Sequence, residues 1–259
     1  MSSPPPVYPA PLSPALLSID GLSRHFGALS ALANVSLTVV PRERRAVIGP
    51  NGAGKTTLFN VVTGQLVPSS GRILFDGLSI TGVPPHAVAR RGISRSFQRT
   101  NLFPKLSVLE NLRLAAAADG RGSWRLLGRV DRLRAPLDRA GETAEAVGLA
   151  TRLAMPAGAL SYGEQRQLEV GVALATRPKL LLLDEPTAGM SPEETLRMTR
   201  MLEGLPREVT LLIIEHDMDV VGSLADRVTV LHYGEVLTEG TFDQVKRDPR
   251  VYEVYLGSV

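Results

Sequence analysis

Cysteine is absent from the 259 residues of this sequence. Its absence excludes a disulfide framework and any thiolate metal site, and it fits a reducing compartment. The four histidines lie far apart along the chain, so a zinc centre is not expected either. We therefore expect a fold that is held together without disulfide or zinc cross-links.

Long apolar runs are missing as well. No run reaches roughly 18 apolar residues, the length that a membrane-spanning helix needs. The densest run, residues 180–183, lies between Lys179 and Asp184. With 44% hydrophobic and 21% charged residues, the composition is typical of a globular chain, long enough for one large α/β domain or two small ones.

Positive charge is in only slight excess, and lysine is scarce. The net charge is +3, and nearly all of the 29 basic residues are arginines. Binding of nucleic acid through bulk electrostatics would need a larger and more concentrated positive charge. We therefore expect no nucleic acid among the partners.

The first 15 residues differ from the rest in composition. Residues 1–15 carry almost no charge and hold six of the 19 prolines. They lack the basic start and the apolar middle of a signal peptide. This composition predicts a disordered leader, with the folded chain beginning near Leu16.

One stretch fits the G-x-x-x-x-G-K-[ST] pattern of a phosphate-binding P-loop. A strand expected over residues 45–48 precedes it and a helix expected over residues 57–62 follows it, which is the setting that the pattern needs. Glycines let the backbone N–H groups face phosphate oxygens, Lys55 would reach the β- and γ-phosphates, and the Thr56 hydroxyl would bind Mg²⁺. The residues expected to contact nucleotide here are Gly49, Pro50, Asn51, Gly52, Ala53, Gly54, Lys55, Thr56 and Thr57.

Two carboxylates follow the densest apolar run. Residues 179–183 predict a buried strand that brings Asp184 and Glu185 to its carboxyl end, where open α/β sheets bind ligands. Asp184 would hold Mg²⁺ through water, and Glu185 would polarise the attacking water. A second buried strand, residues 210–214, ends beside His216, which we expect near the γ-phosphate, although a lone histidine is more often structural.

A capped helix follows a helical stretch that extends from about residue 107 to residue 160. Ser161 and Glu164 form a capping-box pattern ahead of a helix expected over residues 167–175. A capped helix explains this pattern by itself. Ser161 and Gly163 could also form a second phosphate-binding surface at an exposed helix N-terminus.

A basic amphipathic helix is expected within that helical stretch. Arginines recur at spacings of three and four residues, and leucine and valine recur on another face. Such a face can meet a partner or an anionic membrane surface, and a solvated face also explains the pattern. The arginines are Arg121, Arg125, Arg129 and Arg132.

The roles of two further residues are not decided by their chemistry. Phe26 precedes a turn and could either stack on adenine or plug a hairpin. Gln98 ends a strand expected over residues 92–98 and could place an amide oxygen near a metal, although such a residue is usually just solvated. Short alternating runs predict an antiparallel sheet from residues 16–20, 36–40 and 72–75.

Taken together, these motifs resemble those of the ATP-binding subunit of an ABC transporter, over roughly residues 16–257. Six motifs in the family's order are far more specific than a P-loop alone. The resemblance also places Phe26 at the adenine-stacking position. The matching motifs are Walker A at residues 49–56, the Q-loop at Gln98, the LSGGQ-type signature at residues 160–165, Walker B at residues 180–185, the D-loop at residues 188–191 and the switch histidine at His216.

The resemblance implies a transport-coupled ATPase that uses ATP and Mg²⁺. It assigns catalysis to Glu185, His216 and Gln98. It assigns the metal to Thr56, Gln98 and Asp184. From the signature, the residues implied to contact ATP are Ser161, Tyr162, Gly163 and Glu164.

A finer similarity is to the ATPases of branched-chain amino acid importers and their urea and amide relatives. Two departures from the general ABC pattern occur. Tyr162 and Glu164 replace one Gly and the Gln of LSGGQ, a change common in this subgroup. Ser191 replaces the usual D-loop Asp and leaves the coupling between ATP sites open. The segments that carry the finer similarity are residues 96–98, 101–104, 107–111, 160–167 and 248–257.

The family's architecture implies an assembly. Each ATP is held between one chain's P-loop and the other chain's signature, so hydrolysis requires a dimer, with itself or with a paralogous ATPase subunit. The other implied partners are two transmembrane permease subunits and, indirectly, an extracytoplasmic solute-binding protein. The chain would be a peripheral protein on the cytoplasmic face of the inner membrane. We expect Phe103 and Pro104 to contact a permease.

Two rival functions are weighed against transport. A soluble ABC ATPase acting on DNA or the ribosome generally carries two ATPase cassettes or a long coiled-coil insertion, and neither is visible in the sequence. A P-loop metabolic kinase would not explain residues 160–165. The transported solute cannot be inferred, because the ATPase subunit contacts the permeases and not the cargo.

The predicted fold class is α/β. We expect a P-loop NTPase with an ABC-type ATPase core, an antiparallel β subdomain and an inserted helical subdomain. Residues 16–257 would form a single ABC ATPase domain. Within it, residues 16–98 and 176–257 would form the core with the antiparallel sheet, and residues 99–175 the helical subdomain.

Overall fold

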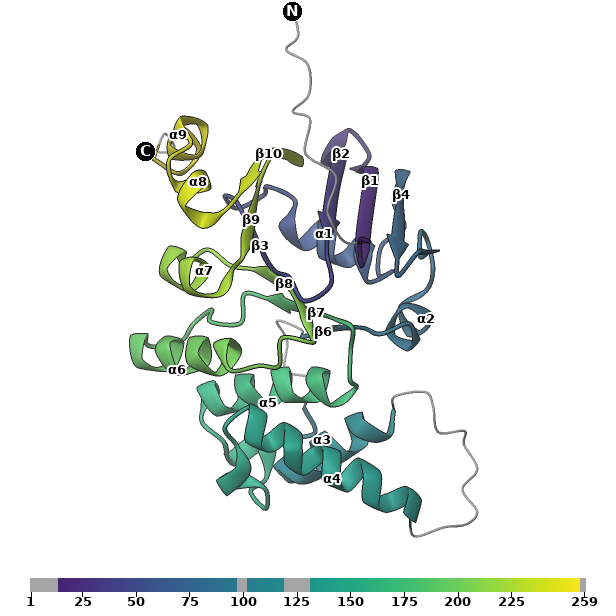
Figure 1. Ribbon diagram of the computed structural model, residues 1–259, viewed down its shortest axis with the longest axis vertical. Helices are drawn as coiled ribbons and strands as arrows, with labels where there is room; N and C mark the ends of the chain where they lie inside the picture. The colour runs from purple at the N-terminus through teal and green to yellow at the C-terminus, as the bar shows by residue number, and fades with distance from the viewer. Residues whose placement is uncertain (1–13, 97–101, 119–130, 257–259) are drawn as a thin grey trace, which may run out of the picture.

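A computed structural model gives the fold of the chain, and it describes residues 14–96, 102–118 and 131–256 (Figure 1). Several sequence-based predictions fall outside these ranges. They concern nearly all of the expected leader, residues 97–101 with Gln98, and the basic helix around Arg121, Arg125 and Arg129.

The amino-terminal part forms an antiparallel sheet in the order β2-β1-β4-β5. Its two long strands extend beyond the predicted residues 16–20 and 36–40. Register shifts between Ile19 and Leu22, and again between Leu22 and Arg24, break the two-residue alternation of apolar residues, so the sequence pattern that marks a strand ends before the backbone pairing does. The strands are β1 (Leu17–Phe26), β2 (Leu29–Val39), β4 (Ser70–Phe75) and β5 (Leu78–Ser79).

A six-stranded sheet forms the centre of the molecule, in the order β10-β9-β3-β8-β7-β6. Every pairing in it is parallel except that of β9 with the edge strand β10. The central strands are buried along their whole length, as the runs of Leu, Ile and Val predicted. The strands are β3 (Arg44–Ile48), β6 (Ile93–Arg95), β7 (Leu180–Asp184), β8 (Thr210–Ile214), β9 (Arg227–His232) and β10 (Glu235–Gly240).

Helix α1 (Lys55–Val62) lies between the two sheets. Its Leu58 and Phe59 are fully buried in one apolar cluster with residues of both sheets. Alternate residues of β7 face opposite sides, so Leu182 joins this cluster and Leu183 joins the cluster beneath α6 and α7. The P-loop helix is therefore held firmly from both sides.

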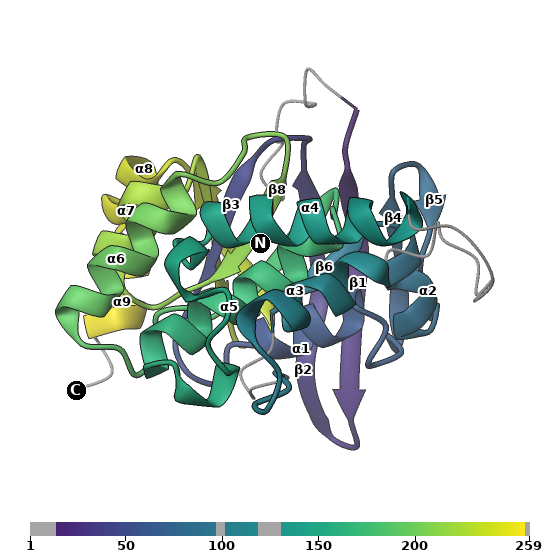
Figure 2. The ribbon, with the colours of Figure 1, turned by 90° about the horizontal axis from the view of Figure 1, so that it is seen from below.

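A helical region lies at the opposite end of the molecule from the antiparallel sheet (Figure 1). Its helices α3 (Val108–Ala117), α4 (Asp131–Ala146) and α5 (Tyr162–Ala175) lie side by side in Figure 2 and share one apolar cluster. Within residues 102–118 and 131–160 the structure shows no strand, as the composition predicted. Helix α5 begins earlier than the expected residue 167, because the N-cap starts the helix directly at Tyr162.

The remaining helices lie in the connections between these elements and at the carboxyl-terminal end of the chain. No helix in the described ranges is long and apolar enough to cross a membrane. These elements are α2 (Pro85–Arg90), α6 (Pro192–Glu203), α7 (Met218–Leu224), α8 (Phe242–Lys246), α9 (Pro249–Leu256) and the short 3-10 helices η1 (Ala150–Arg152) and η2 (Ala157–Ala159).

Candidate nucleotide-binding and catalytic site

The register of the parallel sheet brings the predicted site segments to one edge. Ile214 of β8 pairs with Val47 of β3 on one side and with Asp184 of β7 on the other. Parallel strands end at the same edge, so the P-loop after β3, Glu185 after β7 and His216 after β8 begin at one level. Segments that are far apart in the sequence thus converge beside the N-terminus of α1.

Glycine is required at two places in the P-loop. Gly49 and Gly54 have φ angles of 150° and 99°, which side chains rarely adopt. A Cβ on Gly49 would lie 2.1 Å from the carbonyl oxygen of Leu231, and one on Gly54 would lie 2.5 Å from that of Ala31. A Cβ on Gly52, by contrast, would meet nothing within 4 Å. The loop is therefore packed tightly against the protein on one side and open on the other.

The start of α1 offers unpaired donors to an anion. Its N-cap, Gly54, makes no side-chain capping hydrogen bond, and the first-turn N–H groups of a helix have no intrahelical acceptor. Thr56 in this turn is exposed. Backbone donors and the positive end of the helix dipole suit the phosphates of a nucleotide, so the residues present fit ATP.

Lys55 is buried and lies over the P-loop. Its Nζ donates to the carbonyl oxygens of Gly49 and Pro50 across 2.7 Å and 3.0 Å. Burial lowers the pKa of the Lys55 ammonium, and the nearby Glu185 and Asp184 carboxylates oppose that shift. Phosphate oxygens would offer this ammonium stronger, charged acceptors than the two carbonyls.

Asp184 is fully buried at the end of β7 and is held on one side only. Its Oδ2 accepts a hydrogen bond from Arg95 Nη2 across 2.5 Å. Its other oxygen, Oδ1, is buried and has no hydrogen-bond partner in the described part of the chain. A buried carboxylate oxygen without a donor is costly, so this atom fits a metal-bound water.

Arg95 is a site residue that the sequence-based analysis did not identify. It lies on β6 beside β7, where it pairs in register with Leu182, and its Nη1 donates to Asn60 Oδ1 across 2.6 Å. The only sequence signal for this role was an arginine within a predicted strand. The arginine joins the Walker B carboxylate to α1.

Glu185 adopts a left-handed backbone conformation, with a φ of 48°. A non-glycine residue pays strain energy there, and such strain is often found at functional sites. Its N–H donates to the carbonyl oxygen of Ile214 across 2.9 Å, which fixes the turn. The turn interrupts the strand alternation, and both Glu185 and Asp184 lie near enough to Lys55 to influence its pKa.

His216 is exposed and follows a buried carboxylate that anchors its loop. Glu215 Oε1 accepts hydrogen bonds from the N–H and the hydroxyl of Thr187, and its Oε2 accepts one from the His216 N–H across 3.1 Å. The side chain of His216 is 59% exposed, with Nδ1 3.9 Å from Glu215 Oε2. The imidazole is therefore free to reach a ligand from an anchored backbone.

The signature segment, residues 160–165, contains the predicted helix cap and the first residues of α5. Ser161 caps the helix, and the reciprocal hydrogen bonds of a capping box join it to Glu164. These bonds and Arg152 lower the pKa of the Glu164 carboxyl, the Ser161 N–H contributing most. Among the described residues, no hydrogen bond links Ser161, Tyr162 or Gly163 to the P-loop, which is consistent with a site shared between two chains.

The D-loop, residues 188–191, ends in a helix cap. Ser191 caps α6 and forms a capping box with Glu194, so Ser191 serves as the helix cap that an aspartate at this position could also provide. A Cβ on Gly163 would lie 3.0 Å from Glu194 Oε1, which shows that α5 and α6 start in close contact. The D-loop and the signature segment of one chain are thus neighbours.

Phe26 lies at the tip of the β1–β2 hairpin. Its side chain is 44% exposed, so it does not plug the hairpin as a buried residue would. The guanidinium of Arg24 lies 4.6 Å from the ring centroid. The ring remains accessible for stacking. Gln98 lies outside the described residues.

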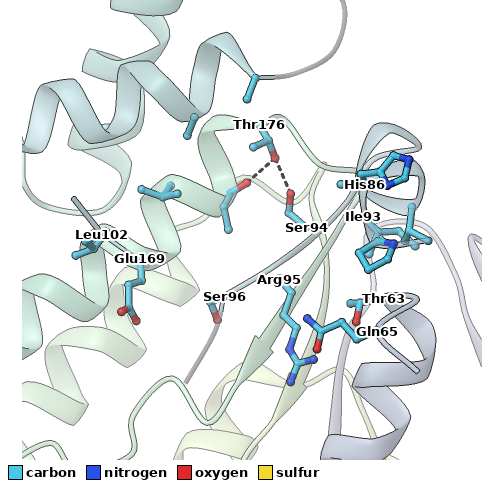
Figure 3. A pocket seen from close by; sticks show the side chains of 17 residues that line it. Thr63, Gln65, His86, Ile93, Ser94, Arg95, Ser96, Leu102, Glu169 and Thr176 are labelled. Carbon is cyan, nitrogen blue, oxygen red and sulfur yellow. Dashed lines mark hydrogen bonds between the residues drawn. The ribbon is translucent and has the colours of Figure 1, made fainter. Parts of the chain in front are cut away.

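A cavity of about 470 Å³ lies between the ATPase core and the helical region (Figure 3). We call it the interface cavity. Thr63, Gln65 and Ile93 line the core side, and Leu102 and Glu169 lie across from them on the helical side. Most of its lining is apolar.

Phe103 is 58% exposed and lines a second, smaller pocket, which shares Ala115 and Val172 with the interface cavity. The buried Asn111 holds the segment that carries it, because its amide accepts from the Phe103 N–H across 2.9 Å and donates to the carbonyls of Phe103 and Ser107. Leu114, which is 44% exposed, lines the same pocket, so the exposed apolar surface extends beyond one side chain, as at contact surfaces. Asn111 itself was not singled out in the sequence.

The sequence is similar to those of known proteins over nearly the whole chain. The family described as "ABC transporter" matches residues 32–188, and "Branched-chain amino acid ATP-binding cassette transporter" matches residues 235–259. The chain is 40% identical to the high-affinity branched-chain amino acid transport ATP-binding protein LivG of Escherichia coli (strain K12), over 95% of this chain and 99% of LivG. It is 39% identical to BraF of Pseudomonas aeruginosa, again over 95% and 99%.

Solved structures agree with this result. A nucleotide-free ATP-binding cassette from an ABC transporter superposes with a TM-score of 0.79 at 31% identity and covers 94% of this chain and 100% of its own. The ADP conformation of the cassette MJ1267 gives a TM-score of 0.82 at 32% identity, with 95% and 100% covered. The chain therefore belongs to the ABC transporter family, as an ATP-hydrolysing cassette akin to the ATP-binding proteins of branched-chain amino acid transport.

Proposed function

We propose that this cassette hydrolyses Mg-ATP to power an importer of branched-chain amino acids. The observation that carries the proposal is the convergence of Lys55, the half-paired Asp184 and the strained Glu185 at one sheet edge. The names of LivG and BraF, which match over almost their whole length, support the solute class. They favour transport over the alternative of a soluble ABC ATPase. Urea and short amides remain the competing solutes.

The site residues divide the work at the nucleotide. The P-loop and the first N–H groups of α1 would surround the phosphates, and Phe26 would stack on adenine. The residues around the phosphates would be Gly49, Pro50, Asn51, Gly52, Ala53, Gly54, Lys55, Thr56 and Thr57. Thr56, Asp184 and Gln98 would hold Mg²⁺, which neutralises phosphate charge when it is bound. Glu185 would take a proton from the attacking water, and His216 and Gln98 would orient the γ-phosphate and that water.

Hydrolysis would require two cassettes. The signature residues of one chain would complete the ATP site of the other, since no hydrogen bond in the described ranges joins them to their own P-loop. These residues are Ser161, Tyr162, Gly163 and Glu164. A dimeric cassette, MJ0796, superposes with a TM-score of 0.73 at 26% identity and supports this arrangement. The second cassette would be another copy of the chain or a paralogous subunit.

The interface cavity would receive the permeases. Its apolar lining and the exposed Phe103 fit a cytoplasmic segment of a transmembrane subunit, two of which would complete the transporter. The chain would then lie on the cytoplasmic face of the inner membrane, and an extracytoplasmic binding protein would deliver the solute. Residues 99–175 would form a helical subdomain between the permease and the ATPase core. The core would consist of residues 16–98 and 176–257. The helices share an apolar cluster of their own, which supports this division.

The test is reconstitution of the chain in lipid vesicles with the permeases and binding protein that purify with it from membranes. We expect ATP-dependent uptake of labelled leucine, isoleucine and valine in preference to urea or acetamide. Lys55→Ala should abolish both ATP hydrolysis and uptake, because the cation facing the β- and γ-phosphates is lost. Lys246→Ala, an exposed lysine on α8, is the matched control and should transport normally. Full ATPase activity of Lys55→Ala, or the absence of any associated permease, would overturn the proposal.

A further inference from the structure

Arg166 lies at the centre of a chain of hydrogen bonds along one face of α5. Its Nε donates to the Tyr162 hydroxyl across 3.2 Å, and its Nη1 donates to Glu169 Oε2 across 2.9 Å. Tyr162 and Glu169 lie four residues before and three residues after Arg166, so all three share one helix face. The guanidinium also lies over the Tyr162 ring, 5.6 Å from its centroid.

One end of this chain reaches the loop that carries the catalytic carboxylate. The Tyr162 hydroxyl donates to the carbonyl oxygen of Ala188 across 3.0 Å, and the Ala188 N–H donates to the carbonyl oxygen of Glu185 across 3.1 Å. The hydroxyl uses its one proton to donate to the Ala188 carbonyl oxygen, and it accepts the hydrogen bond from Arg166 with a lone pair. Arg166 therefore orients the hydroxyl that holds the loop after Glu185.

The other end reaches the interface cavity. Glu169 lines this cavity, and its side chain is only 6% exposed. Its Oε2 is paired with Arg166, whereas its Oε1 is buried and has no hydrogen-bond partner in the described part of the chain. Figure 3 places Glu169 on the helical side, across from Arg95 and Gln65. A buried carboxylate oxygen that lacks a donor raises the free energy of the folded state, so a donor entering the cavity would gain by pairing with it.

We propose that Arg166 is a positioning residue that links the interface cavity to Glu185. A hydrogen-bond donor on the permease segment pairs with Glu169 Oε1 and fixes the Glu169 carboxylate. Arg166 and Tyr162 are then held in one arrangement, and with them the Ala188 loop and the backbone of Glu185. Docking of the permease thereby favours the hydrolytic position of the catalytic carboxylate. This inference rests on the proposed function, because it takes the cavity as the permease site.

A buried ion pair that only supports the fold is the competing explanation. It predicts that Tyr162 and Glu169 contribute independently, since they do not touch each other. The proposal predicts that they act as one unit, so that cutting the chain at either end has the same effect.

The experiment is a double-mutant cycle in the complete transporter in lipid vesicles. Tyr162→Phe removes only the hydroxyl. Glu169→Gln removes the negative charge that binds Arg166 and the incoming donor, and it replaces one acceptor oxygen with an NH2 group. The quantity measured is the stimulation ratio, the ATPase rate with solute-loaded binding protein divided by the rate of the detached cassette. Each variant should lower this ratio by roughly three- to tenfold, and the double variant should lower it no further. The matched controls are Tyr252→Phe and Glu208→Gln, exposed positions on α9 and before β8, which should not change it.

Other readouts separate the outcomes. If Tyr162 acts only by contacting ATP, Tyr162→Phe should raise the KM for ATP and leave the stimulation ratio unchanged, which would overturn the proposal. Multiplying losses in the double variant would also overturn it and favour the structural explanation. If Tyr162→Phe does not fold, Arg166→Lys takes its place in the experiment. Lysine keeps the charge but cannot hydrogen-bond to both Tyr162 and Glu169, so this variant should lower the stimulation ratio by the same factor. If the unmodified transporter shows no stimulation at all, the proposed function itself is wrong.

Discussion

Arg95 Nη2 and Asp184 Oδ2 form a buried ion pair across 2.5 Å, with side-chain exposures of 6% and 0%. Removing one member of a buried pair leaves the other charge without compensation. Arg95→Ala should therefore lower the free energy of unfolding by about 3–5 kcal/mol. Urea denaturation should show a lower midpoint with an unchanged slope.

The partner substitution provides the control for this prediction. Arg95→Ala combined with Asp184→Asn should recover part of the lost stability, because no buried carboxylate is left without a cation. Arg90→Ala changes an exposed arginine on α2 and should shift stability by no more than about 0.5 kcal/mol. A loss for Arg95→Ala as small as that for Arg90→Ala would show that the pair contributes nothing.

Glu185 and Asp184 are adjacent, yet we expect their variants to fail differently. Glu185→Gln keeps size and hydrogen bonding but loses the charge that draws a proton from water, so hydrolysis should fall by roughly 10²–10⁴-fold while Mg-ATP still binds. The variant should accumulate as a closed dimer with ATP trapped. Asp184→Asn should instead impair Mg²⁺-dependent binding of ATP.

Single-turnover hydrolysis and ATP-dependent dimerisation by size exclusion measure the two effects separately. Both variants should be compared with Asp219→Asn, an exposed acid on α7 outside the sheet edge. Near-normal turnover by Glu185→Gln, or loss of ATP binding without a trapped dimer, would mean that the roles belong to the other carboxylate.

Phe103 provides a test of the permease contact. Its side chain is exposed while Asn111 fixes its backbone, so Phe103→Asp should change stability by no more than about 0.5 kcal/mol. The variant should retain ATP hydrolysis as a detached cassette and lose solute uptake in the assembled transporter. Val67→Asp introduces the same charge at another exposed apolar residue and should transport normally. Wild-type uptake by Phe103→Asp would place the contact elsewhere.

Asp248 gives the chain a measurable acid sensitivity. Hydrogen bonds from Arg250 lower the pKa of its carboxyl from 3.8 to about 2. Because the folded-state pKa lies below the unfolded value, the stabilisation is present above about pH 4 and is lost as the pH falls toward 2. Screening by solvent limits it to less than about 1 kcal/mol. Thermal unfolding of Asp248→Asn should depend less on pH over this interval than that of the unmodified chain, and identical profiles would contradict the prediction.

Contiguous residues were sufficient to predict the local structure of the proposed catalytic motifs. The P-loop, the carboxylates at 184 and 185 and the capping box at Ser161 each depend on residues that are close in the sequence, so strand, turn and helix signals indicate them directly. The sequence also predicted both kinds of sheet, and underestimated the length of β1 and β2 where register shifts interrupt the apolar alternation.

Only the tertiary structure decided which distant residues become partners. Arg95 and Asp184 are 89 residues apart, and β6 and β7 place them side by side through backbone pairing that is independent of either side chain. Tyr162 meets Ala188 because α5 and α6 start in contact, a packing that neither local sequence encodes. Local propensity acts over a few residues, whereas burial of a shared core sets the register of whole elements. The sequence by itself therefore determined which groups can do the chemistry, and the packing of sheet and helices determined which side chains hold them in place.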